Sequence, residues 1–380
     1  MQSSTNYIII GNDVNQDNQL LVNNGDGSFT VQTLAGGGRS THSIAVADFN
    51  KDGFEDVVVG NNGPNTNSQL LINNGDGTFT ASNLQNGDPS TTSIATGDFN
   101  NDGWMDIIIG NDAEVNFYAN QILINAADGS GSFLPVVDLA GGLTRTYSIT
   151  TAFIDGDDYL DIIVGKNGNQ PDQVLINNGD LTFTASDLPG FYTFTRSLVA
   201  ADVDNDGDID IIIGNDTAGI GNKLLLNDGT GQFTSSILEG AGFETFGFNT
   251  FGITTGFIND DSYVDIIVGN AYAQPNQLLL NNADGTGTFT SSTLPGAEEN
   301  TICVAVADVN GDGLNDVIIG NTGGQDNQLL INNGPNGVTG LQEFSDSILP
   351  GGTFNTKSII VADIISAGAP PTVSNLDTNV

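Results

Sequence analysis

The sequence predicts an all-β protein, a seven-bladed β-propeller with four antiparallel strands in each blade, closed by strands from both termini. Three observations predict this fold. One apolar run recurs seven times, each copy carries signals for four short strands, and the two ends of the chain supply complementary halves of one copy. The composition agrees, because 50 Gly residues and the lack of helical periodicity favour a turn-rich β protein.

The recurring run is a strand of four or five residues that ends in Gly, for example DVVVGN at 56–61. A run that is apolar at every position is typical of a strand buried on both faces. The spacing between copies is 49 to 55 residues, which indicates a repeat architecture. The seven glycines that end these runs are Gly11, Gly60, Gly110, Gly165, Gly214, Gly269 and Gly320.

Each copy adds three further strands to this run, and the order of the elements is the same throughout. In chain order, one copy comprises a strand at 43–48 (SIAVAD), an acidic loop, the apolar strand at 56–61, an Asn/Gly-rich loop, a strand at 69–74 (QLLINN), a tight turn at 75–77 (GDG) and a strand at 78–84 (TFTASNL). Four short strands separated by turn signals are typical of one propeller blade.

The chain ends predict how the ring closes. The chain opens with YIIIGN at 7–12, a second strand without its first, and KSIIVAD at 357–363 is a first strand without its second. Pairing them in one blade removes the open edges of an unclosed stack. We therefore predict one propeller domain over residues 1–365. Residues 366–380, which contain Pro370 and Pro371, read as an exit linker, so the chain is expected to belong to a larger polypeptide.

The charge of the chain limits its partners. The formal net charge is −39, with 46 Asp+Glu against 7 Lys+Arg, which argues against nucleic acid and anionic membranes and favours cations. Cys303 is the single cysteine, so an intrachain disulfide is impossible. No apolar run approaches the roughly 20 residues that span a bilayer, so direct membrane insertion is not expected. We expect an extracellular or cell-surface location, with any export signal outside this chain.

Four acidic loops share one pattern, with Asp at position 1, Asp or Asn at position 3, Asp at positions 5 and 9, and Gly at position 6. Oxygen ligands at alternating positions suit Ca²⁺, with a backbone carbonyl at position 7. The predicted ligands are Asp48, Asn50, Asp52, Phe54 and Asp56; Asp98, Asn100, Asp102, Trp104 and Asp106; Asp202, Asp204, Asp206, Asp208 and Asp210; and Asp308, Asn310, Asp312, Leu314 and Asp316.

Other metals and a metal-free explanation fit these loops less well. Mg²⁺ demands stricter octahedral geometry, and zinc would need a His/Cys set, whereas the chain has only His42 and Cys303. A solvated Asp/Asn/Gly turn explains one such loop but not four in register. The expectation is about four strong calcium sites, and up to six if two degenerate loops also bind.

The two degenerate loops lie at 153–161 and 257–265. Phe153 and Phe257 replace the first Asp, and Asp158 and Ser262 replace the Gly, so calcium binding there is expected to be weak or lost. The two Phe side chains are predicted to fill the vacated position as part of the core. The carboxylates and amides left for a weakly bound ion are Asp155, Asp157 and Asp161 in the first loop, and Asn259, Asp261 and Asp265 in the second.

The pattern D-x-[DN]-x-D-G-x-x-D before an apolar strand, with segments such as NQLLINN and GDGTFT, resembles the FG-GAP or VCBS repeats of integrin α-subunit propellers and secreted microbial proteins. The resemblance covers about residues 6–365. It implies a calcium-binding propeller, and it implies cell adhesion, carbohydrate binding or a non-catalytic module as the function. In integrin-like propellers the partner binds the face opposite the calcium loops.

The loops between blades carry an unusual share of the basic residues. Arg39, Arg145, Arg196 and Lys357 occur there, with His42 beside them, and the segments at 190–196 and 242–251 add aromatic residues such as Tyr192. Arginine and aromatic side chains converging on a rim favour a binding site for a glycan or a protein. The alternative is that the aromatic residues pack between blades and the cations offset local acidity.

The sequence offers no convincing catalytic constellation, since His42 has no second histidine with which to build an acid–base relay. The recurring Ser43, Ser93, Ser148, Ser197 and Ser358 are assigned to tight packing of the inner strands. We therefore predict a calcium-stabilised extracellular recognition or adhesion module. The alternatives are a domain of a lyase or hydrolase acting on acidic polysaccharide, and a rigid spacer in a large surface protein.

Overall fold

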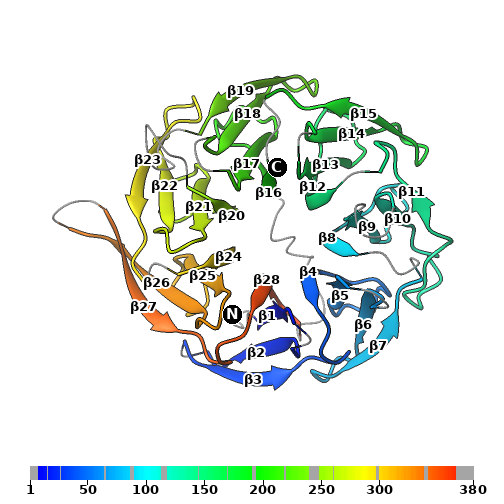
Figure 1. The fold of residues 1–380 in the computed structure, drawn as a ribbon, viewed down its shortest axis with the longest axis horizontal. Helices are drawn as coiled ribbons and strands as arrows, with labels where there is room; N and C mark the ends of the chain where they lie inside the picture. The colour runs from blue at the N-terminus through cyan, green and yellow to red at the C-terminus, as the bar shows by residue number, and fades with distance from the viewer. Residues whose placement is uncertain are drawn as a thin grey trace.

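The structure is a computed structural model of the 380-residue chain. It describes residues 7–14, 16–25, 27–63, 66–85, 90–112, 118–143, 145–168, 170–190, 194–217, 220–238, 248–259, 261–296, 299–337 and 341–364. The exit linker predicted at 366–380 lies outside the described residues. In the described part the chain forms 28 strands and no helix, arranged as seven four-stranded sheets around a central channel (Figure 1).

The four strands of each blade run antiparallel from the channel outward, as predicted. The first strands line the channel: β4 (Thr41–Ala47), β8 (Thr91–Gly97), β12 (Thr146–Ala152), β16 (Thr195–Ala201), β20 (Thr250–Gly256), β24 (Thr301–Ala307) and β28 (Thr356–Ala362). The second strands are β1 (Tyr7–Asn12), β5 (Asp56–Asn61), β9 (Asp106–Asn111), β13 (Asp161–Lys166), β17 (Asp210–Asn215), β21 (Asp265–Asn270) and β25 (Asp316–Asn321).

The two outer strands of each blade complete the ring. The third strands are β2 (Gln19–Asn23), β6 (Gln69–Asn73), β10 (Gln121–Leu123), β14 (Gln173–Asn177), β18 (Lys223–Asn227), β22 (Gln277–Asn281) and β26 (Gln328–Pro335). The outermost strands are β3 (Phe29–Thr33), β7 (Phe79–Asn83), β11 (Val137–Asp138), β15 (Phe183–Asp187), β19 (Phe233–Ile237), β23 (Phe289–Thr293) and β27 (Gln342–Ile348).

Closure by both termini is confirmed. Strand β28 pairs with β1 in the sheet β28-β1-β2-β3, where Ile359 lies opposite Ile10 and Val361 opposite Ile8. The first strands of neighbouring blades contact one another all the way round the channel, including β28 with β4. The shared blade therefore has all four strands, and the ring of first strands has no gap.

The core consists of seven clusters, each between two neighbouring blades. In β5, Val57 and Val59 face the shared blade, whereas Val58 faces the blade of β8. Because successive side chains of a strand point to opposite faces, a strand between two cores must be apolar at every position. This arrangement explains the continuous apolar runs.

The glycine at the end of each run is required by the approach of the next blade. A Cβ placed on Gly60 would lie 2.8 Å from Thr91 Cγ2 and 2.9 Å from Ile94 Cδ1. The equivalent glycines meet the equivalent Thr and aliphatic side chains, as at Gly110 with Thr146 and Ile149. A larger residue here would force the inner strands apart.

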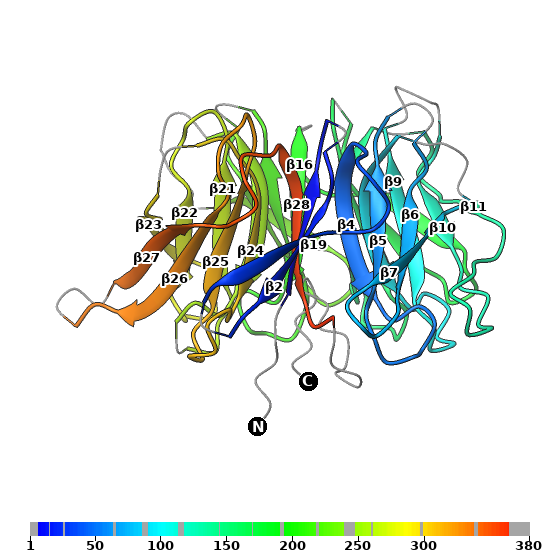
Figure 2. The same ribbon diagram turned by 90° about the horizontal axis from the view of Figure 1, so that it is seen from below.

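Antiparallel order places the loops of every blade on two opposite faces of the ring (Figure 2). One face carries the loops between first and second strands, including the acidic loops, and we call it the acidic-loop face. The loops between second and third strands and those between blades lie on the other, which we call the opposite face.

Candidate functional site

The first Asp of each complete acidic loop holds the loop in a tight turn. In the loop at 48–56, the Asp48 carboxylate accepts hydrogen bonds from the backbone N–H groups of Asp52 (3.2 Å) and Gly53 (2.9 Å). The loops beginning at Asp98, Asp202 and Asp308 repeat both bonds. The glycine at position 6 has a positive φ, 91° at Gly53, as the reversal requires.

The Asp at position 9 joins the loop to the sheet. Asp56 is fully buried, and its two oxygens accept hydrogen bonds from Phe49 N (3.0 Å) and from Asn73 N (2.8 Å), which begins the turn after β6. The degenerate loops keep both bonds, as at Asp161 with Ile154 N and Asn177 N. This aspartate therefore supports the backbone in loops with and without the complete pattern, a role beyond the metal ligand predicted from sequence.

Burial is the main cause of raised pKa values at position 9, and neighbouring loop carboxylates add to it. The pKa is raised to about 7 at Asp56, Asp106 and Asp210 and to about 6 at Asp161, Asp265 and Asp316. The positive charge of a bound cation would favour the ionised form at these positions.

This shift predicts how the metal-free protein responds to pH. Between about pH 4 and pH 7 the folded state binds more protons than the unfolded state, so the free energy of unfolding falls as pH rises. The contribution of the protonated position-9 aspartates to the free energy of unfolding is complete below about pH 4 and is lost above about pH 7. Thermal melts of chelator-treated protein across this range check it, and a melting temperature that rises towards pH 7 would contradict it.

A ring of asparagines, which sequence reasoning missed, connects neighbouring acidic loops. Asn125 Nδ2 donates to the carbonyl oxygens of Met105 (3.1 Å) in its own blade and Phe49 (2.9 Å) in the preceding blade. The residues that make the bond to the preceding blade are Asn23, Asn73, Asn125, Asn177, Asn227, Asn281 and Asn332. Their recurrence in all seven copies was the available signal.

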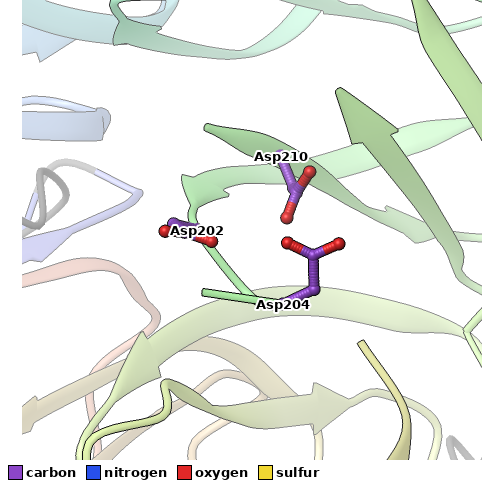
Figure 3. A group of neighbouring side chains, drawn as sticks. All are labelled: Asp202, Asp204 and Asp210. Carbon is purple, nitrogen blue, oxygen red and sulfur yellow. The ribbon is translucent and has the colours of Figure 1, made fainter. Parts of the chain in front are cut away.

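In the loop between β16 and β17, three aspartate carboxylates converge. Carboxylate oxygens of Asp202, Asp204 and Asp210 lie within 4.8 Å of one another (Figure 3). Asp204 Oδ1 is buried and has no hydrogen-bond partner within the described part of the chain. A buried, unpartnered carboxylate oxygen beside two other carboxylates is costly unless a cation is present, so these residues fit Ca²⁺.

The other three complete loops carry Asn in place of Asp204. Asn50 Nδ2 donates to Asp52 Oδ2 (2.8 Å), while Asn50 Oδ1 accepts from Asp52 N (3.0 Å). Asn100 and Asn310 do the same. The amide thereby holds the position-5 carboxylate in place, and both residue types supply oxygen ligands that suit Ca²⁺.

The two degenerate loops differ from each other. Phe257 is partly buried and packs against the core, as predicted. Phe153 is 50% exposed, so the prediction that it fills the core is wrong there. The loop at 257–265 keeps the hydrogen bonds between Asn259 and Asp261 seen in the complete loops. In the other loop, Asp155 Oδ1 accepts a bond of 3.3 Å from Asp157 N.

Position 7 packs against the turn between the third and fourth strands. Phe54 ring atoms would lie 2.8 Å from a Cβ on Gly75, and the Tyr159 ring is equally close to Gly179. Trp104 instead stacks under Lys51 of the neighbouring acidic loop, whose Nζ lies 4.3 Å from the ring centroid. The side chain at position 7 thus anchors the loop while its carbonyl is the predicted ligand.

On the opposite face, three of the predicted basic residues, Arg145, Arg196 and Lys357, form ion pairs. Arg145 Nε lies 3.3 Å from Asp112 Oδ2, and Arg196 Nη2 lies 2.8 Å from Asp216 Oδ2. Lys357 Nζ and His42 Nε2 both approach Asp13 Oδ2, at 3.7 and 3.9 Å. Arg39 Nη1 donates to the Asn67 carbonyl oxygen (3.0 Å). Tyr192 lies outside the described residues.

His42, Arg196 and Lys357 line a cavity of about 200 Å³ in the channel, together with Tyr147 and Phe251. Burial lowers the pKa of His42 to about 4, so its imidazole is neutral near pH 7. Arg39 and Arg145 are not among the lining residues. The structure therefore brings together three of the six residues predicted for a ligand site and adds two aromatic rings.

The recurring serines of the inner strands have a polar role as well as a packing one. Ser43 Oγ accepts a hydrogen bond from Ile94 N (3.0 Å) of the next blade, and Ser148 Oγ accepts one from Leu198 N (3.0 Å). Equivalent bonds reach Ser93, Ser197 and Ser358. These bonds join neighbouring first strands around the channel.

Comparison with models of known protein families shows which family the chain belongs to. A family model described as FG-GAP-like repeat matches residues 5–59, 48–109, 100–164, 154–213 and 258–319, and the FG-GAP repeat model matches 304–337. The chain belongs to the FG-GAP repeat family. This FG-GAP propeller gives no match in a search of curated proteins. Its described part holds no helix long and apolar enough to cross a membrane.

Solved structures similar to this FG-GAP propeller share its fold. One is an Agrocybe aegerita lectin that recognises non-reducing terminal N-acetylglucosamine, with 20% identity, 95% of each chain covered and a TM-score of 0.63. Another is virginiamycin B lyase of Staphylococcus aureus, with 16% identity, 80% of this chain and 83% of that chain covered, and a TM-score of 0.51. At these identities the likeness concerns the fold.

Proposed function

We propose that the protein is a calcium-stabilised extracellular recognition module that binds a glycan or a protein partner on the opposite face. The observation that carries the proposal is the separation of chemistry between the two faces. One face holds the acidic loops, whereas basic residues and aromatic rings line one cavity in the central channel. The FG-GAP family and the lectin neighbour are compatible with a recognition role.

Calcium is proposed for the four complete loops. The best support is the loop at 202–210, where Asp204 Oδ1 needs a partner and Asp202 and Asp210 lie beside it. The equivalent backbone turns in the loops at 48–56, 98–106 and 308–316 support the same assignment there. Sites of this kind fill at the millimolar calcium found outside cells, which supports an extracellular location.

A glycan array probed with calcium and then with chelator tests the recognition function. We expect the protein to bind a defined set of glycans in the presence of calcium. The array should include glycans that end in N-acetylglucosamine, because the similar lectin recognises that sugar. Chelation should reduce binding by unfolding or loosening the ring. The protein alternative is tested by a parallel screen of cell-surface proteins.

The enzyme and spacer alternatives give different results in the same experiment. New reducing ends or unsaturated sugars after incubation with acidic polysaccharide would establish a hydrolase or a lyase and contradict a binding-only role. An array and a protein screen that both remain featureless in calcium would contradict the recognition function and favour a spacer.

A further inference from the structure

Five of the seven first strands share the pattern Thr-x-Ser-aliphatic, in which the second position varies; Gly252 in β20 and Cys303 in β24 replace the Ser. Thr-His-Ser-Ile at 41–44 corresponds to Thr-Tyr-Ser-Ile at 146–149, Thr-Arg-Ser-Leu at 195–198 and Thr-Lys-Ser-Ile at 356–359. The fold explains the constant positions, because the Thr is buried, the Ser joins neighbouring blades, and the aliphatic residue enters the core. The fold does not dictate the residue between Thr and Ser.

Each variable residue lies in a β-bulge. Ser43 pairs with Gly60 and Thr41 with Asn61, so His42 is the extra residue of the first strand. The same shift leaves Tyr147, Arg196, Phe251 and Lys357 unpaired in their strands. A bulge redirects a side chain relative to the regular sheet, and here the redirected side chains line one cavity.

The strands that carry these side chains lie on two sides of the channel (Figure 1). Lys357 and His42 come from the neighbouring strands β28 and β4, and Tyr147, Arg196 and Phe251 come from β12, β16 and β20 on the other side (Figure 1). A group that enters the cavity therefore meets a cation on each side.

Arg196 is held in a defined orientation. Its guanidinium carbon lies 4.5 Å from the centroid of the Tyr147 ring and 4.7 Å from that of Phe251. Its Nε and Nη2 both contact Asp216 Oδ2, so Nη1 lies outside this ion pair and can bind a ligand. A guanidinium fixed before binding loses little side-chain entropy when a ligand arrives.

The cavity wall is rich in hydrogen-bond donors. Ser43, Ser148 and Ser197 each accept a backbone N–H through Oγ, which leaves the hydroxyl proton to donate. None of the described residues that line the cavity is Asp or Glu, although the chain has 46 acidic residues. Donors and cations without a lining carboxylate select a ligand rich in acceptor oxygens.

We propose that this cavity binds a single uronic acid residue, such as the end of an acidic glycan, through its carboxylate. The inference rests on the proposed recognition function and names its ligand class. Arg196 contacts the carboxylate, Lys357 contacts the same sugar from the other side of the cavity, and the serine hydroxyls donate to the sugar oxygens. A volume of about 200 Å³ suits one sugar ring, since pockets for drug-sized ligands occupy roughly 300–1,000 Å³.

Titration calorimetry with glucuronic acid and glucose tests the proposal, because these sugars differ only at the carboxylate carbon. In calcium we expect glucuronic acid to bind roughly tenfold or more tightly than glucose. Arg196→Gln and Lys357→Gln should each lower the affinity for glucuronic acid by a similar factor. The matched control is Lys51→Gln, which removes an equal charge on the acidic-loop face and should leave the affinity within about twofold.

The outcomes separate this inference from the recognition function. Equal binding of glucose and glucuronic acid, or unchanged affinity in both cavity variants, would overturn it. Glycan-array binding that glucuronic acid does not inhibit would also overturn it while leaving the recognition function standing. An array and a protein screen that both show no binding would contradict the inference and the recognition function together. Free glutamate competing as well as glucuronic acid would overturn the sugar assignment. If the Arg196→Gln variant has a lowered melting temperature, the affinity of the Lys357→Gln variant for glucuronic acid decides the test.

Discussion

Removing calcium is expected to lower the melting temperature of the protein substantially. The unfolded chain has no preformed site, so the binding free energy of each loop adds to the free energy of unfolding. A site with free calcium a hundredfold above its Kd contributes about 2.7 kcal/mol, and four complete loops are proposed. Calorimetry in chelator and in millimolar calcium measures the difference.

Trp104 gives this experiment a readout at one loop. It is the single tryptophan of the chain, occupies position 7 of the loop at 98–106, and stacks under Lys51. Its emission should change as calcium is titrated, and Asp102→Asn should shift that titration to higher calcium. The matched control is Asp157→Asn in a degenerate loop. Identical melting temperatures in chelator and calcium, with no bound metal by elemental analysis, would show that the loops are turns.

Asp161→Ala is expected to destabilise the protein strongly even without calcium. Asp161 is buried in a degenerate loop, and its oxygens accept hydrogen bonds from Ile154 N (2.9 Å) and Asn177 N (2.8 Å). Leaving two buried N–H groups unpaired costs about 1–3 kcal/mol each. Urea denaturation in chelator, at a pH below the raised pKa of about 6, measures the loss with this carboxyl uncharged.

The control for this prediction lies in the same loop. Asp157 is exposed and accepts one hydrogen bond, from Tyr159 N (2.8 Å), so Asp157→Ala should change the free energy of unfolding by less than about 0.5 kcal/mol. Equal stabilities for the two variants would show that the position-9 aspartate matters only as a metal ligand. The structure predicts the opposite, because the same bonds recur at Asp265 in the other degenerate loop.

The seven-bladed fold and its closure follow from the sequence because every element recurs. Each apolar run such as DVVVGN must be buried on both faces, and the halves at 7–12 and 357–363 complete one copy. The acidic loops were located for the same reason, since four copies align on the strand that follows them. In a repeat, local patterns repeated in register carry the information that an alignment of relatives would otherwise supply.

Contacts between blades could not be read from these local patterns. The bond from Asn125 to the Phe49 carbonyl joins residues 76 positions apart, and Arg196 is held between rings from two other blades. Phe153 and Phe257 occupy the same position in their copies, yet one is half-exposed and the other packs against the core. Such outcomes depend on the neighbours that surround each copy, which differ even where the copy does not.

The sequence therefore established the blades, their number and the acidic loops, because these depend on hydrophobic periodicity and on ligand spacing within one copy. Only the tertiary structure decided that Arg196, Lys357 and His42 share a cavity and that both Arg196 and Lys357 form ion pairs with aspartates. The physical reason is that ring closure sets which side chains converge. A one-residue bulge in each first strand then turns the variable residue toward the channel.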